Sequence, residues 1–233
     1  MATKNKYKDM ELNFKDMGLC DYKTTWNYQQ EVHKMVKAAK LQSRKPTHKH
    51  EIIFVEHPHV YTLGKRGKEQ NLLVQESHLE QVGAKLYKID RGGDITYHGP
   101  GQVVCYPIID LDYFKLGVRA YVHLLEEAVI QSLADFSITA ERKKGATGVW
   151  IDVGSASKER KICAIGVKVS RSVTMHGLAL NVNTDNSFFQ HINPCGFSSK
   201  GVTSMQQELD TAVDMHALVK KLKKSLSLLM LPV

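Results

Sequence analysis

The spacing of apolar and polar residues predicts several elements in the first half of the chain. Residues 21–41 carry apolar side chains at helical spacing with charged side chains between them, which predicts an amphipathic helix. Residues 51–56 form a short apolar run and residues 84–90 alternate between apolar and polar positions, so both predict strands. Residues 103–109 are apolar and rich in β-branched types, which predicts a buried strand.

The same patterns continue in the second half. Residues 119–136 have one apolar face at helical spacing and predict a helix, and residues 148–152 predict a short strand. Residues 161–170 and 174–183 are largely apolar runs joined by a turn, which is typical of a hairpin. Residues 213–229 combine leucines and valines with lysines. This pattern suits an acidic membrane surface, but a helix packed on the domain is favoured.

Length and composition fit one ordinary globular domain. The 233 residues include 42% hydrophobic and 24% charged residues, without an internal repeat, a low-complexity tract or a Pro/Ser-rich linker. No apolar run approaches the roughly 18 residues that a membrane span requires, and residues 1–9 lack the apolar core of a signal peptide. We therefore expect a single α/β or α+β domain over residues 1–233, located in the cytoplasm and without a membrane partner.

The positive charge of the chain favours an acidic partner. The formal net charge is +8, which admits nucleic acid, an acidic carrier protein or an acidic membrane surface without identifying one of them. The basic residues are spread along the chain, with only short clusters at 142–144 and 220–224. Because no zinc-finger or RNA-binding signature accompanies them, we expect no nucleic-acid partner.

The four cysteines carry no metal-binding or disulfide spacing. Cys20, Cys105, Cys163 and Cys195 include no C-x-x-C pair, which argues against a zinc site or a disulfide framework. We therefore expect no metal and free thiols in a reducing compartment. Each cysteine is then either a small buried hydrophobe or a nucleophile.

A glycine-rich stretch, residues 91–107, lies between two predicted strands. Its glycines indicate positive φ angles or a backbone that comes close to a ligand. A glycine-rich turn with a hydrogen-bonded His98 explains the same pattern. The stretch lacks the Gly-Lys-Ser/Thr ending of a P-loop and the Gly-x-Gly-x-x-Gly spacing of a dinucleotide site.

Two residues further along have the chemistry of a nucleophile and its partner. Cys195 lies between a proline and a glycine, and Lys161 begins a largely apolar strand. If they meet, the ammonium favours the thiolate, the thiolate attacks an acyl carbonyl, and the amine transfers protons. Histidine is the more usual partner of a cysteine nucleophile, and His98, His176 and His191 are available. Spacing alone leaves these alternatives open.

Several motifs, in this order along the chain, resemble those of the lipoyl(octanoyl) transferases of lipoate biosynthesis. They are Arg91-Gly-Gly-Asp-Ile-Thr-Tyr-His-Gly-Pro-Gly-Gln-Val-Val-Cys-Tyr106, Lys161-Ile-Cys-Ala-Ile-Gly166, His176-Gly-Leu-Ala-Leu-Asn-Val182 and Ile192-Asn-Pro-Cys-Gly196. Weaker matches at 22–29 and 56–64 extend the resemblance over residues 20 to 205. Beyond this core we expect only a C-terminal helix, at 211–230.

The resemblance implies a mixed β-sheet flanked by helices, the fold of biotin and lipoate protein ligases. It implies that an octanoyl or lipoyl group is taken from acyl carrier protein and passed to a lysine of lipoyl domains of 2-oxoacid dehydrogenase complexes or of the glycine-cleavage H protein. No cofactor is implied, and we expect a monomer. Acyl carrier protein and lipoyl domains are typically acidic, which agrees with the positive charge.

The resemblance also implies roles for individual residues. In the pattern of the family, Cys195 carries the acyl group as a thioester, and Lys161 lowers the pKa of the cysteine and transfers protons. The residues implied to line the acyl and phosphopantetheine channel are Arg91, Gly92, Gly93, Asp94, Ile95, Thr96, Tyr97, His98, Ala164, Ile165, Gly166, Gly177, Leu178 and Ala179.

Other interpretations compete with this one. A lipoate or biotin protein ligase of the same fold would activate the free acid with ATP and would not rely on a cysteine nucleophile. A non-catalytic protein that binds acidic carriers or nucleic acid would tolerate the loss of Cys195. Within the transferase, Cys163 is the rival thiol because, two positions after Lys161, it would share the same strand face. Its apolar neighbours favour a buried, structural role instead.

Overall fold

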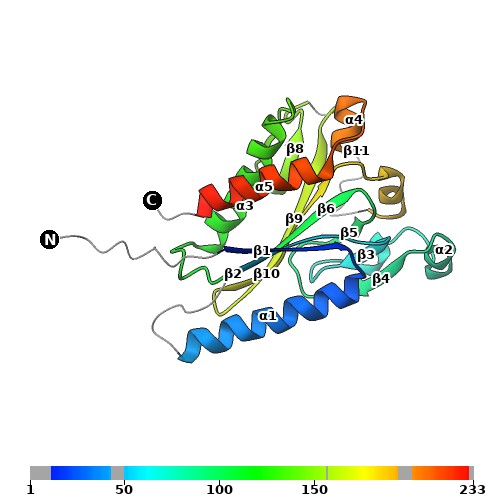
Figure 1. Ribbon diagram of the computed structural model, residues 1–233. Coiled ribbons are helices and arrows are strands. Elements are labelled where there is room, and N and C mark those ends of the chain that lie inside the picture. The colour runs from blue at the N-terminus through cyan, green and yellow to red at the C-terminus, as the bar shows by residue number, and fades with distance from the viewer. Residues whose placement is uncertain (1–11, 43–49, 156, 194–200, 231–233) are drawn as a thin grey trace.

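The computed structural model describes residues 12–42, 50–155, 157–193 and 201–230, which form two β-sheets and the helices around them (Figure 1). The main sheet has eight strands, of which β1 and β2 run parallel while the pairs from β2 to β7 run antiparallel. Its order is β1 (Leu12–Leu19), β2 (His50–Glu56), β6 (Gln102–Ile108), β10 (Val173–Asn181), β9 (Arg160–Ser170), β8 (Ala146–Ile151) and β7 (Glu141–Lys143), and β11 (Gly201–Val202) pairs parallel with β9.

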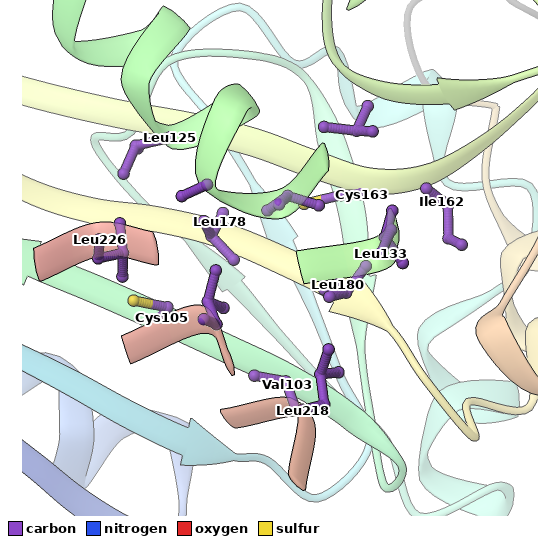
Figure 2. Packing of buried hydrophobic residues seen from close by; sticks show 14 of the residues in the cluster. Val103, Cys105, Leu125, Leu133, Ile162, Cys163, Leu178, Leu180, Leu218 and Leu226 are labelled. Atoms are coloured by element: carbon purple, nitrogen blue, oxygen red, sulfur yellow. The ribbon is translucent and has the colours of Figure 1, made fainter. Parts of the chain in front are cut away.

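Helices cover both faces of the main sheet. Helix α1 (Tyr22–Gln42) lies on one face, and α3 (Val118–Ala134) and α5 (Met215–Met230) lie on the other (Figure 1). Side chains of β6 alternate between these layers, so that Val103 and Cys105 pack with α3 and α5 (Figure 2). Each buried Val, Leu or Ile side chain in this core stabilises the fold by about 1.5–3 kcal/mol.

Acidic side chains fix the starts of two of these helices. Asp21 precedes α1 and its Oδ1 accepts hydrogen bonds from the amides of Lys23 at 2.9 Å and Thr24 at 3.2 Å. Asp214 precedes α5, and its Oδ1 accepts from the amides of the second and third helical residues at 2.9 and 3.2 Å. Such caps satisfy amides that have no partner within the helix.

A second, three-stranded sheet carries the glycine-rich stretch. It has the order β4 (Lys85–Lys88), β3 (Val60–Leu63) and β5 (Ile95–His98) and its own small hydrophobic cluster. Short helical segments lie near these strands, namely η1 (Glu69–Asn71), α2 (Glu76–Gln81) and η2 (Asn186–His191). Helix α4 (Met205–Leu209) follows β11, and its Met205 packs in the hydrophobic cluster of the main sheet.

The long predicted elements are confirmed. The helices expected at 21–41, 119–136 and 213–229 correspond to α1, α3 and α5, and the hairpin corresponds to β9 and β10. The strands expected at 51–56, 84–90, 103–109 and 148–152 correspond to β2, β4, β6 and β8. Within the part of the chain that the structure describes, no helix is both long and apolar enough to cross a bilayer.

Candidate active site

A cavity of about 1230 Å³ is lined by residues of both sheets. The glycine-rich stretch and β5 form one wall, and β8, β9 and β10 form another. Lys161 and almost all the predicted channel residues line this cavity, namely Arg91, Gly92, Gly93, Asp94, Ile95, Thr96, His98, Ala164, Ile165, Gly166, Gly177, Leu178 and Ala179. The fold therefore brings together motifs that are far apart in the sequence.

Tyr97 is the predicted channel residue that does not line the cavity. In β5 the side chains of Thr96 and Tyr97 project to opposite sides, and Tyr97 is fully buried in the cluster of the small sheet. Its hydroxyl hydrogen-bonds His59 Nδ1 at 2.7 Å, and its ring stacks on Phe188 at 5.0 Å. Tyr97 thus packs behind the residues that line the cavity and does not line it itself.

Arg91 braces the glycine-rich stretch against β3. Its guanidinium is buried, and Nη2 donates to the carbonyl of Thr62 at 2.6 Å while Nη1 donates to the carbonyl of Gly92 at 3.0 Å. Gly92 in turn donates its amide to the carbonyl of Val167 in β9 at 2.9 Å. A Cβ on Gly166 would lie 2.7 Å from the Gly92 carbonyl, so glycine permits this close approach of two backbones.

A β-bulge in β9 turns Lys161 toward the cavity. Trp150 of β8 pairs with Lys161 and the adjacent Val149 pairs with Cys163, so Ile162 is an extra residue in β9. Trp150 and Lys161 therefore line the cavity, whereas Val149 and Cys163 lie in the core beneath α3. Bulges next to active sites re-aim side chains in this way.

The expectation that Cys163 shares the face of Lys161 is wrong, because the bulge interrupts the alternation of the strand. Cys163 is fully buried and packs in the cluster that contains Leu133 and Leu180 (Figure 2). Burial raises the pKa of its thiol well above the usual range. A neutral, enclosed thiol is a poor nucleophile, so the structural role suggested by its apolar neighbours is the one it fulfils.

The ammonium of Lys161 is held at the cavity wall by polar and aromatic contacts. Its Nζ donates to the carbonyl of Thr147 at 3.2 Å and lies 4.6 Å from the centroid of the Trp150 ring. The indole Nε1 of Trp150 donates to the carbonyl of Ala146 at 3.0 Å, which fixes the plane of the ring. The motifs do not include Trp150, because a tryptophan in a short apolar strand is typical of a hydrophobic core.

The histidines considered as partners of a cysteine nucleophile are placed differently from one another. His98 lines the cavity, and burial lowers its pKa to about 3, so it is neutral at physiological pH. Its Nδ1 pairs with Gln102, whose Nε2 donates to Asn181 Oδ1 at 2.9 Å. Gln102 and Asn181 line the cavity as well. His191 is not a lining residue and pairs through Nδ1 with the hydroxyl of Tyr61 at 2.8 Å.

His176 is held in an uncommon backbone conformation beside a carboxylate. It has a φ of 61° and is 1% exposed, and its Nε2 donates to Asp90 Oδ1 at 3.1 Å. Burial lowers the pKa of His176. The hydrogen bond from His176 and the ammonium of Lys168 hold the pKa of Asp90 well below its usual range. His176 therefore lines the cavity as a side chain fixed in place by its hydrogen bond to Asp90.

Cys195 lies outside the described residues, but the chain on either side of its segment lines the cavity. Asn193 and Gly201 are both lining residues. Asn193 donates its amide to the carbonyl of Asn71 at 2.8 Å, and Gly201 begins β11, which pairs with Arg160 and Lys161. Among the described residues, no group of three or more His, Cys, Asp and Glu side chains is placed to hold a metal ion.

Comparison with protein families gives a match over most of the chain. Residues 21–227 match the family described as "Lipoyl protein ligase A/B catalytic domain". An octanoyltransferase of Bacteroides fragilis (strain YCH46) is 54% identical over 211 residues, which cover 91% of this chain and 94% of that protein. An octanoyltransferase of Christiangramia forsetii is 50% identical over 220 residues, which cover 92% and 93%.

Solved structures share the fold at low sequence identity. A crystal structure of lipoate-protein ligase A bound with ATP has a TM-score of 0.74 at 16% identity and covers 95% of this chain and 86% of that one. A bipartite lipoate protein ligase of Thermoplasma acidophilum has a TM-score of 0.69 at 17% identity and covers 95% and 84%. These likenesses confirm the ligase-like fold that the motifs implied.

Proposed function

This chain belongs to the lipoyl protein ligase A/B catalytic-domain family, and from that premise we propose that it transfers an octanoyl or lipoyl group from acyl carrier protein to a lysine of a lipoyl domain through a thioester on Cys195. The general activity follows from its relatives. The chain is an acyltransferase, because proteins 50% and 54% identical over more than nine-tenths of its length are octanoyltransferases. The donor, the acceptor and the covalent intermediate are the proposed part.

The observation that carries the proposal is the placement of Lys161. The bulge at Ile162 directs this lysine into the cavity, while the rival thiol of Cys163 faces the core. The segment that contains Cys195 leads into β11, and the amide of Thr203, just after β11, donates to the carbonyl of Lys161 at 3.0 Å. An ammonium beside a cysteine favours the thiolate, which is the reactive form.

In the first proposed step the thiolate of Cys195 attacks the carbonyl carbon of the donor thioester. A new C–S bond to Cys195 forms, the C–S bond to the carrier breaks, and the departing sulfur takes a proton from the Lys161 ammonium. The acyl-enzyme then has a neutral amine at Lys161, ready to act as a base.

In the second proposed step the neutral amine of the acceptor lysine attacks the acyl-enzyme. An amide bond forms, the C–S bond to Cys195 breaks, and the surplus proton passes to Lys161, which restores the thiolate and ammonium pair. Histidine is less suited to this proton transfer here, since burial lowers the pKa of both His98 and His176.

Small side chains on β9 and β10 favour a long, narrow acyl group. Ala164 lies opposite Ala179 and Gly166 lies opposite Gly177 in the strand register, and all four line the cavity. These pairs leave a groove between the sheets in which methylene groups lose contact with water. Burial contributes about 0.8 kcal/mol per CH₂, which supports an aliphatic substrate over a short acyl group.

The proposed partners agree with the charge of the chain. Acyl carrier protein as donor, and lipoyl domains of 2-oxoacid dehydrogenase complexes or the glycine-cleavage H protein as acceptors, would be attracted by the net charge of +8. The reaction needs no cofactor, because the donor thioester is already activated.

The test is intact-protein mass spectrometry after incubation with octanoyl acyl carrier protein. We expect a hydroxylamine-labile octanoyl adduct that peptide mapping places on Cys195. Cys195→Ala should lose the adduct and at least about a thousandfold in transfer rate, because the nucleophile is removed. Cys163→Ala is the matched control and should keep the adduct.

Two results would contradict the proposal. Full transfer activity in Cys195→Ala would exclude the thioester mechanism. Modification of a lipoyl domain by free octanoate that requires ATP and survives the Cys195→Ala substitution would instead support the ligase reaction, which proceeds without a cysteine nucleophile.

A further inference from the structure

A tight turn between β3 and η1 carries two basic side chains at the opening of the cavity. The amide of Gly67 donates to the carbonyl of Gly64 at 2.9 Å, which closes a β-turn with Lys65 and Arg66 at its central positions. Both basic residues are exposed. Arg66 also lines the cavity. Its side chain therefore lies where the cavity meets solvent.

Backbone hydrogen bonds fix this turn on the glycine-rich stretch. The amide of Lys65 donates to the carbonyl of Arg91 at 3.0 Å, and the amide of Arg66 donates to the carbonyl of Gly93 at 3.2 Å. A third bond, to the carbonyl of Asp94 at 3.2 Å, comes from the first residue of the turn. These bonds involve main-chain atoms only, so they place the two basic side chains without using their charged groups.

The charged groups of Lys65 and Arg66 have no carboxylate partner among the residues that the structure describes. The acidic residue that follows them in the chain, Glu69, pairs with Lys88 at 2.5 Å. The carboxylate of Asp94 accepts from a side-chain amide at 2.6 Å and from a backbone amide at 2.7 Å. An ammonium and a guanidinium side by side attract an anion, and a guanidinium binds phosphate through two parallel N–H donors.

We propose that Lys65 and Arg66 form a phosphate-binding subsite, which holds the phosphate group of the donor's phosphopantetheine arm at the opening of the cavity. This inference rests on the function proposed above, in which the acyl group arrives on acyl carrier protein. The donor is then recognised at two points: its acyl chain lies in the groove between the sheets, and its phosphate lies at the turn.

The size and lining of the cavity agree with a ligand longer than the acyl group alone. Its volume of about 1230 Å³ exceeds the roughly 300–1,000 Å³ of most small-molecule pockets. Small residues of β9 and β10 form the groove proposed for the acyl chain, whereas the turn at 64–67 is cationic. The glycine-rich stretch joins these walls, because Arg91 and Gly93 bond to the turn and Gly92 bonds to β9. One extended ligand can therefore reach both.

Carboxylates on the surface of an acidic carrier offer the same sign of charge as a phosphate. The placement of Arg66 favours the phosphate, because this residue lines the cavity that the arm enters, while acidic side chains stay on the surface of the carrier. Two small donors separate these sources. Octanoyl-phosphopantetheine and octanoyl-pantetheine differ only in the phosphate, and neither includes the carrier protein.

The experiment measures kcat/KM for both small donors at low ionic strength, with a lipoyl domain as acceptor. The ratio of the two values is compared, because any general effect of a substitution on the cavity cancels. We expect the protein to favour octanoyl-phosphopantetheine by about tenfold or more. Arg66→Gln should lower that ratio by about five- to tenfold, since a charge-assisted, two-point interaction is lost. Lys65→Gln should lower it by about two- to threefold, because an ammonium binds as a point charge.

Arg171→Gln is the matched control for the loss of one positive charge. Arg171 is exposed in the turn between β9 and β10 and is not a lining residue of the cavity. Its replacement should leave the ratio unchanged. A fall in the ratio equal to that of Arg66→Gln would show that the total charge of the chain, and not the turn, recognises the phosphate.

The outcomes distinguish this inference from the proposed function. If neither octanoyl acyl carrier protein nor a small donor acylates the protein, the proposed function fails and this inference fails with it. If acylation occurs but the ratio is near one, or if Arg66→Gln leaves the ratio unchanged, only the phosphate-binding subsite is excluded. If Arg66→Gln slows transfer from octanoyl acyl carrier protein without changing the ratio, the turn binds carboxylates of the carrier, which also overturns the inference.

Discussion

Gly148 shows how a single residue permits the geometry of the candidate active site. It precedes the bulged pair of β8 and β9 and has a φ of +119°, a conformation that other residues rarely adopt. A Cβ at this position would lie 2.5 Å from the carbonyl oxygen of Cys163 and 3.5 Å from Cε of Lys161. The absence of a side chain therefore lets β8 approach β9 at the point where Lys161 turns toward the cavity.

The first prediction from this geometry concerns Gly148→Ala. The positive φ alone should cost about 1–3 kcal/mol of unfolding free energy, and the collision with the Cys163 carbonyl should add to that cost. Because β9 must shift, we also expect the rate of acyl-enzyme formation to fall by more than tenfold in protein that is still folded. Thermal unfolding and the initial rate of thioester formation measure the two effects.

Gly154→Ala is the matched control for Gly148→Ala. Gly154 also has a positive φ, +91°, but a Cβ there meets nothing within 4 Å. Gly154→Ala should lower the free energy of unfolding only through the strain of the positive φ, and the rate of acylation should stay unchanged. Equal loss of acylation in both variants would show that the close approach at Gly148 has no role at the site.

At the scale of elements, an ion-pair cluster fastens α4 to the start of β9. Arg160 donates through Nε to Glu208 Oε1 at 2.6 Å and through Nη2 to Oε2, and Thr203 Oγ1 donates to Glu208 Oε1 at 2.5 Å. The Glu208 side chain is 13% exposed, so solvent screens this pair weakly. The cluster sets where β11 lies beside Lys161.

We predict that Glu208→Gln weakens this attachment. The amide keeps the shape of the carboxylate but loses the charge-assisted, two-point interaction with Arg160, which should cost about 1–3 kcal/mol of unfolding free energy. We expect the kcat for acyl transfer to fall several-fold, since Lys161 and β11 are no longer held together as firmly. Chemical denaturation and steady-state kinetics provide the measurements.

An exposed ion pair supplies the comparison for Glu208→Gln. Glu69 pairs with Lys88 at 2.5 Å, with side chains 76% and 67% exposed. Glu69→Gln should leave stability and kcat unchanged, because exposed pairs contribute little. If Glu208→Gln behaved in the same way, the cluster would be a surface feature and not an attachment for the site.

The sequence predicts the elements whose pattern is local and misses those that depend on distant partners. Helix α1 and strand β6 follow from the periodicity of their own residues. Strand β3 has only four residues, too few for a clear pattern of its own. It is defined by its pairing with β5, in which Val60 lies opposite His98. The channel residues follow from the motif resemblance. Tyr97 differs from the others because its side chain packs in the cluster of the small sheet, which a motif does not show.

The bulge at Ile162 marks another limit of sequence reasoning. Strict alternation placed Cys163 on the face of Lys161, and one extra residue in β9 reverses that assignment. Ile162 resembles its apolar neighbours, so composition gives no signal of the bulge. The close approach of Gly148 to Cys163 and Lys161, which are distant from it in the sequence, becomes visible only when the strands are paired.

For the molecule as a whole, the net charge bears on how the proposed partners would reach the cavity. The net charge is +8, and the proposed donor and acceptors are acidic proteins. Attraction over several ångströms raises the rate of encounter with such partners and is screened by salt. A small uncharged donor would reach the same cavity without this assistance.

We therefore predict that salt separates two donors of the same acyl group. Raising the ionic strength from about 0.05 M to about 0.5 M should lower kcat/KM for octanoyl acyl carrier protein by about tenfold or more, because screening removes the electrostatic part of the association rate. For octanoyl-pantetheine, which is uncharged, kcat/KM should change less than about twofold, since only the chemistry at Lys161 and the thiol remains. An equal fall for both donors would show that salt acts on the active site itself, and that the positive charge of the chain does not serve to recruit an acidic carrier.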